Sequence, residues 1–248
     1  MTAIPSGPSA VRSTAGTLPS FRSPCAIILP VQTNGQRPTT RLFLVRHGQT
    51  LHNHVNRLAG WTDTPLTALG RQQAEQVADY LAGLCQPQAL YTSPLQRARE
   101  TAQAIGRRLK LTPVVVPDLR EMHFGACENL TLDEIRQRFP DLWPRLLDED
   151  DLTFTWPGGE SRAGFIQRVR QVFTTLLQHH PGETIVIVAH GGVLAVWLAD
   201  QLEGRPTRWR AYQLDNCAVC EVEAGNGRLH LHRFNDCAHL GLTPPSAP

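Results

Sequence analysis

The sequence predicts an α/β fold, a three-layer α/β/α sandwich around a mostly parallel mixed sheet. From Arg41 onward, short apolar runs alternate with longer amphipathic segments, which is the pattern of a βαβ series. The run from Arg41 to Val45 is continuously apolar after its first residue, as expected for a strand that is buried on both faces. Two late apolar segments are joined through Ala224–Gly227 and have the pattern of a hairpin, so the sheet should contain both strand directions.

Each element has its own local signal. The strands are expected at residues 41–45, 89–92, 114–116, 184–189, 217–222 and 228–232. Thr67 can cap a helix over residues 68–84, and Ser161 can cap one that continues through Gln178. Ser93-Pro94 has the cap-plus-proline signature of a helix start, which predicts a helix that ends at about Leu109. Two further helices are expected at residues 132–139, before Pro140, and at residues 193–202.

Composition narrows the classes of function. The 248 residues, with 41% hydrophobic and 19% charged side chains, predict one catalytic-sized domain. The net charge of +2 gives no positive field for nucleic acid or an anionic membrane, so a small molecule is the expected partner. Six dispersed cysteines are not typical of a disulfide-stapled module and favour a reducing compartment, the cytoplasm. No apolar run approaches the roughly 20 residues that span a bilayer.

The chain is expected to divide into three parts. Residues 1–40 are rich in Ser, Thr, Pro and Gly and contain no Asp or Glu, which predicts a disordered or poorly ordered extension. An organelle transit peptide shares that composition and stays open as the alternative. Residues 41–240 form the predicted domain, and residues 241–248 a short tail. A homodimer is neither indicated nor excluded.

Polar residues cluster just after the predicted strands. Arg46 and His47 follow the first strand, and His190 follows the late strand at residues 184–189. Because ligands of open α/β sheets bind outside the carboxyl ends of the strands, these residues should face one another. Arg97 lies on the first turn of the helix after the second strand, and Glu121 lies in the loop after the third. The sequence therefore predicts one site built from four strand ends.

This set of side chains suits phosphoryl transfer. Arginine matches phosphate with a planar fork and stays charged, and a neutral histidine can attack phosphorus. A second, protonated histidine can hold the phosphate oxygens, and a glutamic acid can protonate the leaving oxygen. Two histidines and a carboxylate are also a metal-ligand set, but the arginines would repel a cation and already supply positive charge. No metal and no cofactor are therefore expected. Cys217 and Cys220 have CxxC spacing without a second pair and are interpreted as strand residues.

The segment Leu44–Thr50, with its Arg-His-Gly, resembles the signature of the histidine phosphatase superfamily, the phosphoglycerate mutase-like fold. The resemblance extends over roughly residues 41–240. It includes Asn53, Arg57, Gly60, Leu66-Thr67, Gly70, Tyr91–Arg97, Leu119–Glu121, Gly125, Pro157–Ser161 and Ala189–Gly192. A single Arg-His-Gly is a weak signal, whereas four motifs in this order at strand ends are specific.

The resemblance implies a role for each matching residue. His47 corresponds to the nucleophile and Glu121 to the proton donor, while Arg46, Arg97 and His190 correspond to the phosphate pocket. Asn53 is expected to touch the phosphate as well, although a polar loop residue of this kind is often only a helix cap. Gln49 replaces the glutamate that is more usual after the glycine.

The expected reaction is hydrolysis of a small organic phosphomonoester. Phosphoglycerate mutases of the family carry an arginine directly after the catalytic glutamate and a long basic insertion, whereas here Met122 follows and no such insertion precedes Trp156. Mutase-type transfer and a non-catalytic phospho-ligand module remain the alternatives. The ending Phe234–Leu240 resembles that of phosphoserine, α-ribazole and broad-specificity phosphatases, so His239 is a candidate for binding the non-phosphate end of the substrate. The physiological substrate is left open.

Overall fold

The computed structural model describes residues 38–225 and 227–241, in which six strands form one sheet of order β3-β2-β4-β1-β5-β6. The strands are β1 (Thr40–Arg46), β2 (Ala89–Thr92), β3 (Val114–Val115), β4 (Thr184–Ala189), β5 (Val219–Gly225) and β6 (Arg228–Asp236). β4 pairs in parallel with β1 and β2, and β2 in parallel with β3, whereas β5 is antiparallel to β1 and β6. The predicted mixed, mostly parallel sheet and its hairpin are confirmed.

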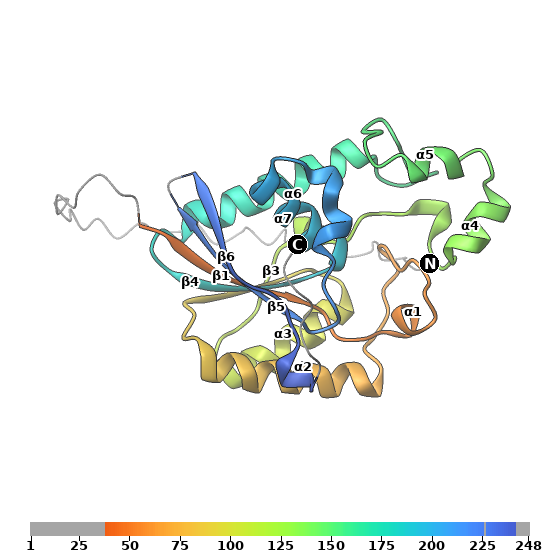
Figure 1. Ribbon diagram of the computed structural model, residues 1–248. Helices are drawn as coiled ribbons and strands as arrows, with labels where there is room; N and C mark the ends of the chain where they lie inside the picture. Colours follow the sequence, from red (N-terminus) through yellow and green to blue (C-terminus); the bar gives the residue numbers. More distant parts are fainter. Residues whose placement is uncertain (1–37, 226, 242–248) are drawn as a thin grey trace, which may run out of the picture. The chain divides into compact units, whose positions relative to one another are not determined.

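Four long helices cover the two faces of the sheet. α2 (Ala68–Leu84) and α3 (Gln96–Leu109) lie on one face, and α6 (Arg162–His179) and α7 (Gly191–Glu203) lie on the other (Figure 1). Thr67 caps α2 by accepting the Gly70 N–H over 3.0 Å, and Ser161 caps α6 by accepting the Gly164 N–H over 3.0 Å. Both predicted caps and the three-layer sandwich are therefore confirmed.

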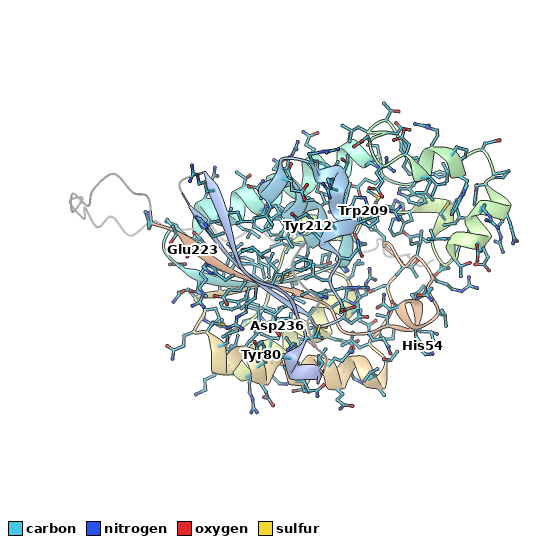
Figure 2. The ribbon with its side chains drawn as sticks, in the orientation of Figure 1. His54, Tyr80, Trp209, Tyr212, Glu223 and Asp236 are labelled. Atoms are coloured by element: carbon cyan, nitrogen blue, oxygen red, sulfur yellow. The ribbon has the colours of Figure 1, made fainter. Side chains whose placement is uncertain are left out.

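The carboxyl end of β6 is hydrogen-bonded to α2, one of the two helices on the first face of the sheet. Tyr80 of α2 donates its O–H to Asp236 Oδ2 over 2.6 Å, and Figure 2 labels both residues where the end of β6 passes over α2. Arg233 of β6 donates to Glu221 over 2.8 Å, across the hairpin. These polar contacts stabilise the antiparallel edge of the sheet against α2.

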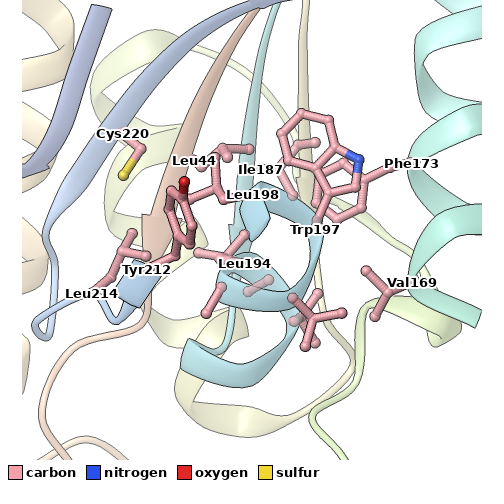
Figure 3. Packing of buried hydrophobic residues seen from close by; sticks show 14 of the residues in the cluster. Leu44, Val169, Phe173, Ile187, Leu194, Trp197, Leu198, Tyr212, Leu214 and Cys220 are labelled. Atoms are coloured by element: carbon pink, nitrogen blue, oxygen red, sulfur yellow. The ribbon is translucent and has the colours of Figure 1, made fainter. Parts of the chain in front are cut away.

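The alternation of β1 side chains explains its continuous apolar sequence. Leu42 and Leu44 pack under α6 and α7, whereas Phe43 and Val45 pack under α2 and α3, and all four are fully buried. Figure 3 shows the first of these layers, in which Leu44 and Ile187 of the sheet lie beneath side chains of α6 and α7. Each such side chain contributes about 1.5–3 kcal/mol when it is buried.

The structure corrects the predicted start of α3. Ser93 is not its cap, because the helix begins at Gln96 after Leu95, which makes no side-chain cap. The Ser93 hydroxyl instead accepts the Leu95 N–H over 3.3 Å. It also bonds to His190, which follows the neighbouring parallel strand β4. Smaller differences affect the ends of the other elements: β3 is shorter than expected, β5 and β6 are longer, and α7 starts two residues earlier.

Several short elements have no periodic pattern and were not predicted. They are α1 (Leu51–His54), α5 (Trp143–Leu147), η1 (Pro117–Leu119), η2 (Gly125–Cys127), η3 (Pro206–Tyr212) and η4 (Ala238–Leu240). Figure 1 shows α1 and α5 beyond the end of β1, on the same side as the predicted α4 (Leu132–Arg138). These helices add walls at the carboxyl edge of the sheet.

Parts of the predicted organisation lie outside the described residues. They include nearly all of the expected extension, residues 1–40, with Cys25, and nearly all of the expected tail, residues 241–248. Among the residues that are described, no helix combines the length and apolar character needed to cross a bilayer.

Candidate active site

Two histidines meet at the carboxyl ends of neighbouring parallel strands. Arg46 of β1 and Ala189 of β4 are register partners, so His47 and His190 follow them at the same edge of the sheet. The His47 N–H donates to the Ala189 carbonyl over 3.1 Å. The two rings are buried, with centroids 5.1 Å apart and planes at 62°. Strand register therefore sets the spacing of the two rings.

His47 has a defined proton arrangement. Its Nδ1 lies 2.8 Å from the Gly48 carbonyl, which can only accept, so Nδ1 carries the proton. Its Nε2 accepts from Arg97 Nε over 3.2 Å and therefore carries the lone pair. Burial lowers the pKa of His47 well below its ordinary 6.5, and Arg97 and Arg46 lower it further. The ring is thus neutral at pH 7, with a nucleophilic nitrogen.

Arg97 is a fully buried cation, with 1% of its surface exposed. Its Nη2 donates to the Gly60 carbonyl over 2.7 Å, and its Nη1 donates to the Thr62 carbonyl over 3.0 Å. Glu128 holds this loop by accepting the Thr62 N–H over 2.7 Å, a role that the sequence did not indicate. Burial lowers the pKa of Arg97 to about 10, so the side chain stays charged at neutral pH.

Arg46 provides a second cation beside His47, and its side chain is partly buried. Its Nη1 donates to the Leu214 carbonyl, while its Nε is buried without a hydrogen-bond partner among the described residues. Burial lowers the pKa of Arg46, and the carboxylates of Glu121 and Asp215 oppose that shift. A buried donor without an acceptor is costly and is satisfied when an anion binds.

His190 lies next to the His47 ring, is fully buried and is neutral. Its Nε2 lies 2.7 Å from the Ser93 hydroxyl, and its Nδ1 is buried without a partner among the described residues. Burial lowers its pKa well below 6.5, and the charge of Arg97 lowers it further. The sequence analysis expected a protonated His190, whereas its burial and the charge of Arg97 favour the neutral ring. Ser93 also follows a strand, so the rule that located the histidines points to it too.

Glu121 is held by main-chain donors from two segments. Its Oε2 accepts the Gly192 N–H over 3.0 Å, and its Oε1 accepts the Met122 N–H over 2.9 Å. A Cβ at position 192 would overlap Glu121 Oε1, so a larger residue there would displace the carboxyl group. The start of α7 therefore fixes the position of the carboxyl group.

The loop that carries Glu121 is anchored from α6. Arg168 donates to the main-chain carbonyls of Asp118 and Arg120, each over 2.8 Å, and to that of Glu121 over 3.2 Å. It is itself oriented by a two-pronged ion pair with Glu160, at 2.9 and 2.8 Å. Arg168 and Glu160 were not predicted as site residues, because an arginine that binds carbonyls has no distinct sequence pattern.

Asn53 lies at the site but mainly orders its own turn. Its Oδ1 accepts the Thr50 N–H over 3.1 Å, in a capping box at the start of α1. Asn216, which the sequence did not indicate, donates to Asn53 Oδ1 over 3.2 Å and to the His47 carbonyl over 2.9 Å. Both amides line the same cavity as His47. Asn216 therefore connects the loop before β5 to the backbone of the predicted nucleophile.

The structure does not bring His239 to the cavity. Its ring stacks on Tyr80 of α2, with centroids 4.8 Å apart, and its Nε2 lies 3.0 Å from the Cys217 carbonyl. It is absent from the residues that line the cavity, whereas Arg46, His47, Arg97 and Asn53 are among them. His190 does not line the cavity either, but its ring contacts that of His47. The contacts of His239 are those of a residue that packs the end of the chain onto α2.

A cavity of about 620 Å³ contains Arg46, His47, Arg97 and Glu121 together with residues of several surrounding elements. These four residues lie at its inner end, and its outer part extends to α5 and η3. The volume falls within the range of small-molecule sites, roughly 300–1,000 Å³. Within the described part of the chain, no group of three or more His, Cys, Asp or Glu side chains has the arrangement of a metal site. The inner end combines two arginine cations, the neutral ring of His47 and the carboxyl group of Glu121.

Known proteins share this fold and sequence. The model of the histidine phosphatase superfamily (branch 1) matches residues 42–237. A metal-independent phosphoserine phosphatase from Arabidopsis thaliana is 33% identical over 203 residues, which are 81% of this chain and 83% of that protein. The solved structure of a mycobacterial glucosyl-3-phosphoglycerate phosphatase superposes with a TM-score of 0.70 at 33% identity, over 79% of this chain and 99% of that chain.

Some relatives are considerably longer than this chain. A bifunctional protein from Mycobacterium tuberculosis is 39% identical over 161 residues, which are 65% of this chain but 44% of that protein. The chain therefore spans less than half the length of that curated relative.

Proposed function

The chain belongs to the histidine phosphatase superfamily, and we propose that it is a metal-independent phosphatase of a small organic phosphomonoester that forms a phosphohistidine on His47. The observation that carries this proposal is the state of His47: its Nδ1 proton is fixed by the Gly48 carbonyl, so Nε2 presents a lone pair beside the Arg97 cation. A nucleophile and an anion pocket at one point are the minimum for attack on phosphorus.

In the first half of the proposed reaction, a phosphomonoester places its phosphoryl group between Arg46 and Arg97. Arg97 Nε shifts its hydrogen bond from His47 Nε2 to a phosphate oxygen, which frees the lone pair of that nitrogen. His47 Nε2 then attacks phosphorus and forms an N–P bond, while the bond from phosphorus to the ester oxygen breaks. Glu121 gives its proton to that oxygen, so the product leaves as an alcohol. Arg46 and the buried Arg97 supply the positive charge that other phosphatases take from a metal ion.

In the second half, water attacks the phosphohistidine. Glu121 is now a carboxylate and accepts a proton from that water, while the N–P bond breaks and its electrons return to His47 Nε2. Inorganic phosphate leaves, and Glu121 is protonated again. The main-chain N–H groups of Gly192 and Met122 keep the carboxyl group in one position through both halves.

Hydrolysis is proposed over mutase-type transfer because of the residue after Glu121. Met122 stands where the mutases of the family carry an arginine, and its sulfur accepts the Trp156 indole N–H over 2.9 Å. A thioether in that place adds no charge to hold a phosphoryl group on the enzyme or to bind a second acid group.

The five cysteines of the described residues are free thiols, which supports a reducing location such as the cytoplasm.

The test is phosphate release from a panel of small phosphomonoesters, without a bisphosphate primer and with 3-phosphoglycerate in the panel. We expect release from at least one ester and no isomerisation. If 3-phosphoglycerate is isomerised faster than it is hydrolysed, the chain is a mutase. Stoichiometric ligand binding without any phosphate release would instead identify a non-catalytic module.

A further inference from the structure

The cavity continues well past the residues that reach phosphorus. Its outer wall is formed by α4, α5, the segment before α6, and η3. Large apolar side chains dominate this wall, namely Leu132, Trp143, Leu147, Phe154, Trp156 and Trp209. They lie in the same cavity as His47 and Arg97, so a molecule that binds there is in reach of the phosphate end.

Two of these side chains are unusually exposed for apolar residues. Leu132 is 49% exposed and Leu147 is 56% exposed, and both border the cavity. Apolar surface around a concave site is removed from water when an apolar ligand group enters, which favours binding. The outer wall is thus suited to an apolar group of the molecule that carries the phosphate.

The cations of the outer wall are already paired. Arg57 donates to both carboxylate oxygens of Glu134, over 2.7 and 3.1 Å, and Arg210 forms an ion pair with Glu149. Arg162 donates to main-chain carbonyls of the loop before α6. A carboxylate on the substrate would have to displace one of these partners, and Glu149, which also lines the cavity, would repel it. In the described part of the outer wall, every arginine therefore has an acceptor of its own.

We propose that the outer part of the cavity is a subsite for an uncharged apolar group, so that the preferred substrates are phosphomonoesters of hydrophobic alcohols or phenols. The inference rests on the proposed phosphatase activity and adds the class of substrate. It also implies that esters with a second anion, such as phosphoserine or 3-phosphoglycerate, are poor substrates of this chain.

A homologous series tests the subsite. We would measure kcat/KM for linear alkyl phosphates from methyl to hexyl, with the full-length protein. A buried methylene favours binding enough to raise kcat/KM about two- to fourfold per carbon, because contacts shared by ground state and transition state raise that ratio. Propyl phosphate should exceed phosphoserine, which has a similar carbon skeleton. A flat series beyond ethyl, or the opposite order for that pair, overturns the subsite.

Substitutions in the exposed part of the outer wall distinguish a loss of the subsite from a general loss of activity. Leu147→Gln should reduce the dependence on chain length, because it places a polar amide in the wall. Leu152→Gln is the matched control, since Leu152 is similarly exposed, at 45%, but does not line the cavity. The control should keep the slope of the unmodified protein. Equal slopes in all three proteins overturn the proposal.

Two other outcomes also decide the matter. If no ester of the series releases phosphate, the proposed phosphatase function fails and the inference fails with it. If phosphate is released but the rate does not depend on chain length, only the subsite fails and the phosphatase function stands. Apart from a substrate, the molecule that could cover this apolar wall is a second copy of this chain. If Leu147→Gln converts a dimer to a monomer in sedimentation and leaves the slope unchanged, the wall is a subunit contact and not a substrate subsite.

Discussion

Arg97 donates its Nε–H to His47 Nε2 over 3.2 Å, so a buried cation faces the one ring nitrogen that carries a lone pair. The contact keeps that nitrogen unprotonated and places the charge of Arg97 next to the point of attack on phosphorus. It depends on carbonyls of a separate loop, Gly60 and Thr62, which hold the guanidinium in place. The proposed nucleophile is thus oriented by a residue of another element.

Replacement of His47 by Ala should abolish the phosphoenzyme. The Ala variant has no lone pair at the phosphorus, so turnover should fall to background. The measurement is retention of labelled phosphate on protein denatured in alkali, where phosphohistidine survives, and its loss in acid. Persistence of the labelled protein in the variant would overturn the mechanism.

Replacement of Glu121 by Gln should separate substrates by their leaving groups. Alkyl phosphates need a proton on the departing oxygen, whereas the phenolate of p-nitrophenyl phosphate is stable without one. We expect a loss of roughly 10²- to 10⁴-fold in kcat for the alkyl ester and a much smaller loss for the aryl ester. An equal loss on both substrates would remove Glu121 from the role of acid.

Gly192→Ala should impair the same step without touching the nucleophile. The new Cβ would overlap Glu121 Oε1, so the carboxyl group must move, and kcat for alkyl phosphates should fall at least tenfold. Gly191→Ala is the comparison, because its Cβ would meet Arg46 Nε, Cζ and Cδ at ordinary distances of 3.5, 3.7 and 3.8 Å and would not approach Glu121. Phosphoenzyme formation from p-nitrophenyl phosphate should persist in both variants. Equal effects of the two substitutions would contradict this account of Gly192.

Chelation should leave turnover intact. Arg46 and the buried Arg97 supply positive charge at the phosphate end, and no step of the proposed reaction uses a metal ion. The measurement is the rate of phosphate release before and after dialysis against EDTA. Loss of activity that Mg²⁺ or Zn²⁺ restores would show that the site needs a cation.

Stability should fall as the pH is lowered through the range of unfolded histidine. Burial lowers the pKa of His190 well below 6.5, so below about pH 6.5 the unfolded chain takes up a proton that the folded chain refuses. The contribution of neutral His190 to the free energy of unfolding is therefore complete above about pH 6.5. It is lost progressively as the pH falls from there towards the lower pKa of the folded state. In His190→Gln, the drop in unfolding free energy from pH 8 to pH 5 should shrink by up to about 2 kcal/mol. Denaturant titrations at both pH values measure it, and an unchanged drop would contradict the assignment.

Much of the fold follows from local patterns in the sequence. The run of Thr184–Ala189 was predicted with the bounds that the structure gives, because a strand buried on both faces is apolar without interruption. The cap at Thr67 was also predictable, since its hydroxyl acts within its own turn. The prediction failed at Ser93, whose hydroxyl bonds to His190 almost a hundred residues further along the chain. A local signature cannot include such a partner.

The candidate site divides in the same way. The sequence by itself determined that His47, Arg97, Glu121 and His190 would gather at one edge of the sheet, because parallel strands bring their carboxyl ends to the same side. Only the tertiary structure decided how they are held: Asn216 against the His47 backbone, Arg168 under the Glu121 loop, and His239 on Tyr80 outside the cavity. The apolar outer wall also depends on α5 and η3, which are too short to show a period. The position and burial of the strands follow from hydrophobic pattern, whereas these contacts join residues far apart in the chain, and only packing of the whole domain brings them within bonding distance.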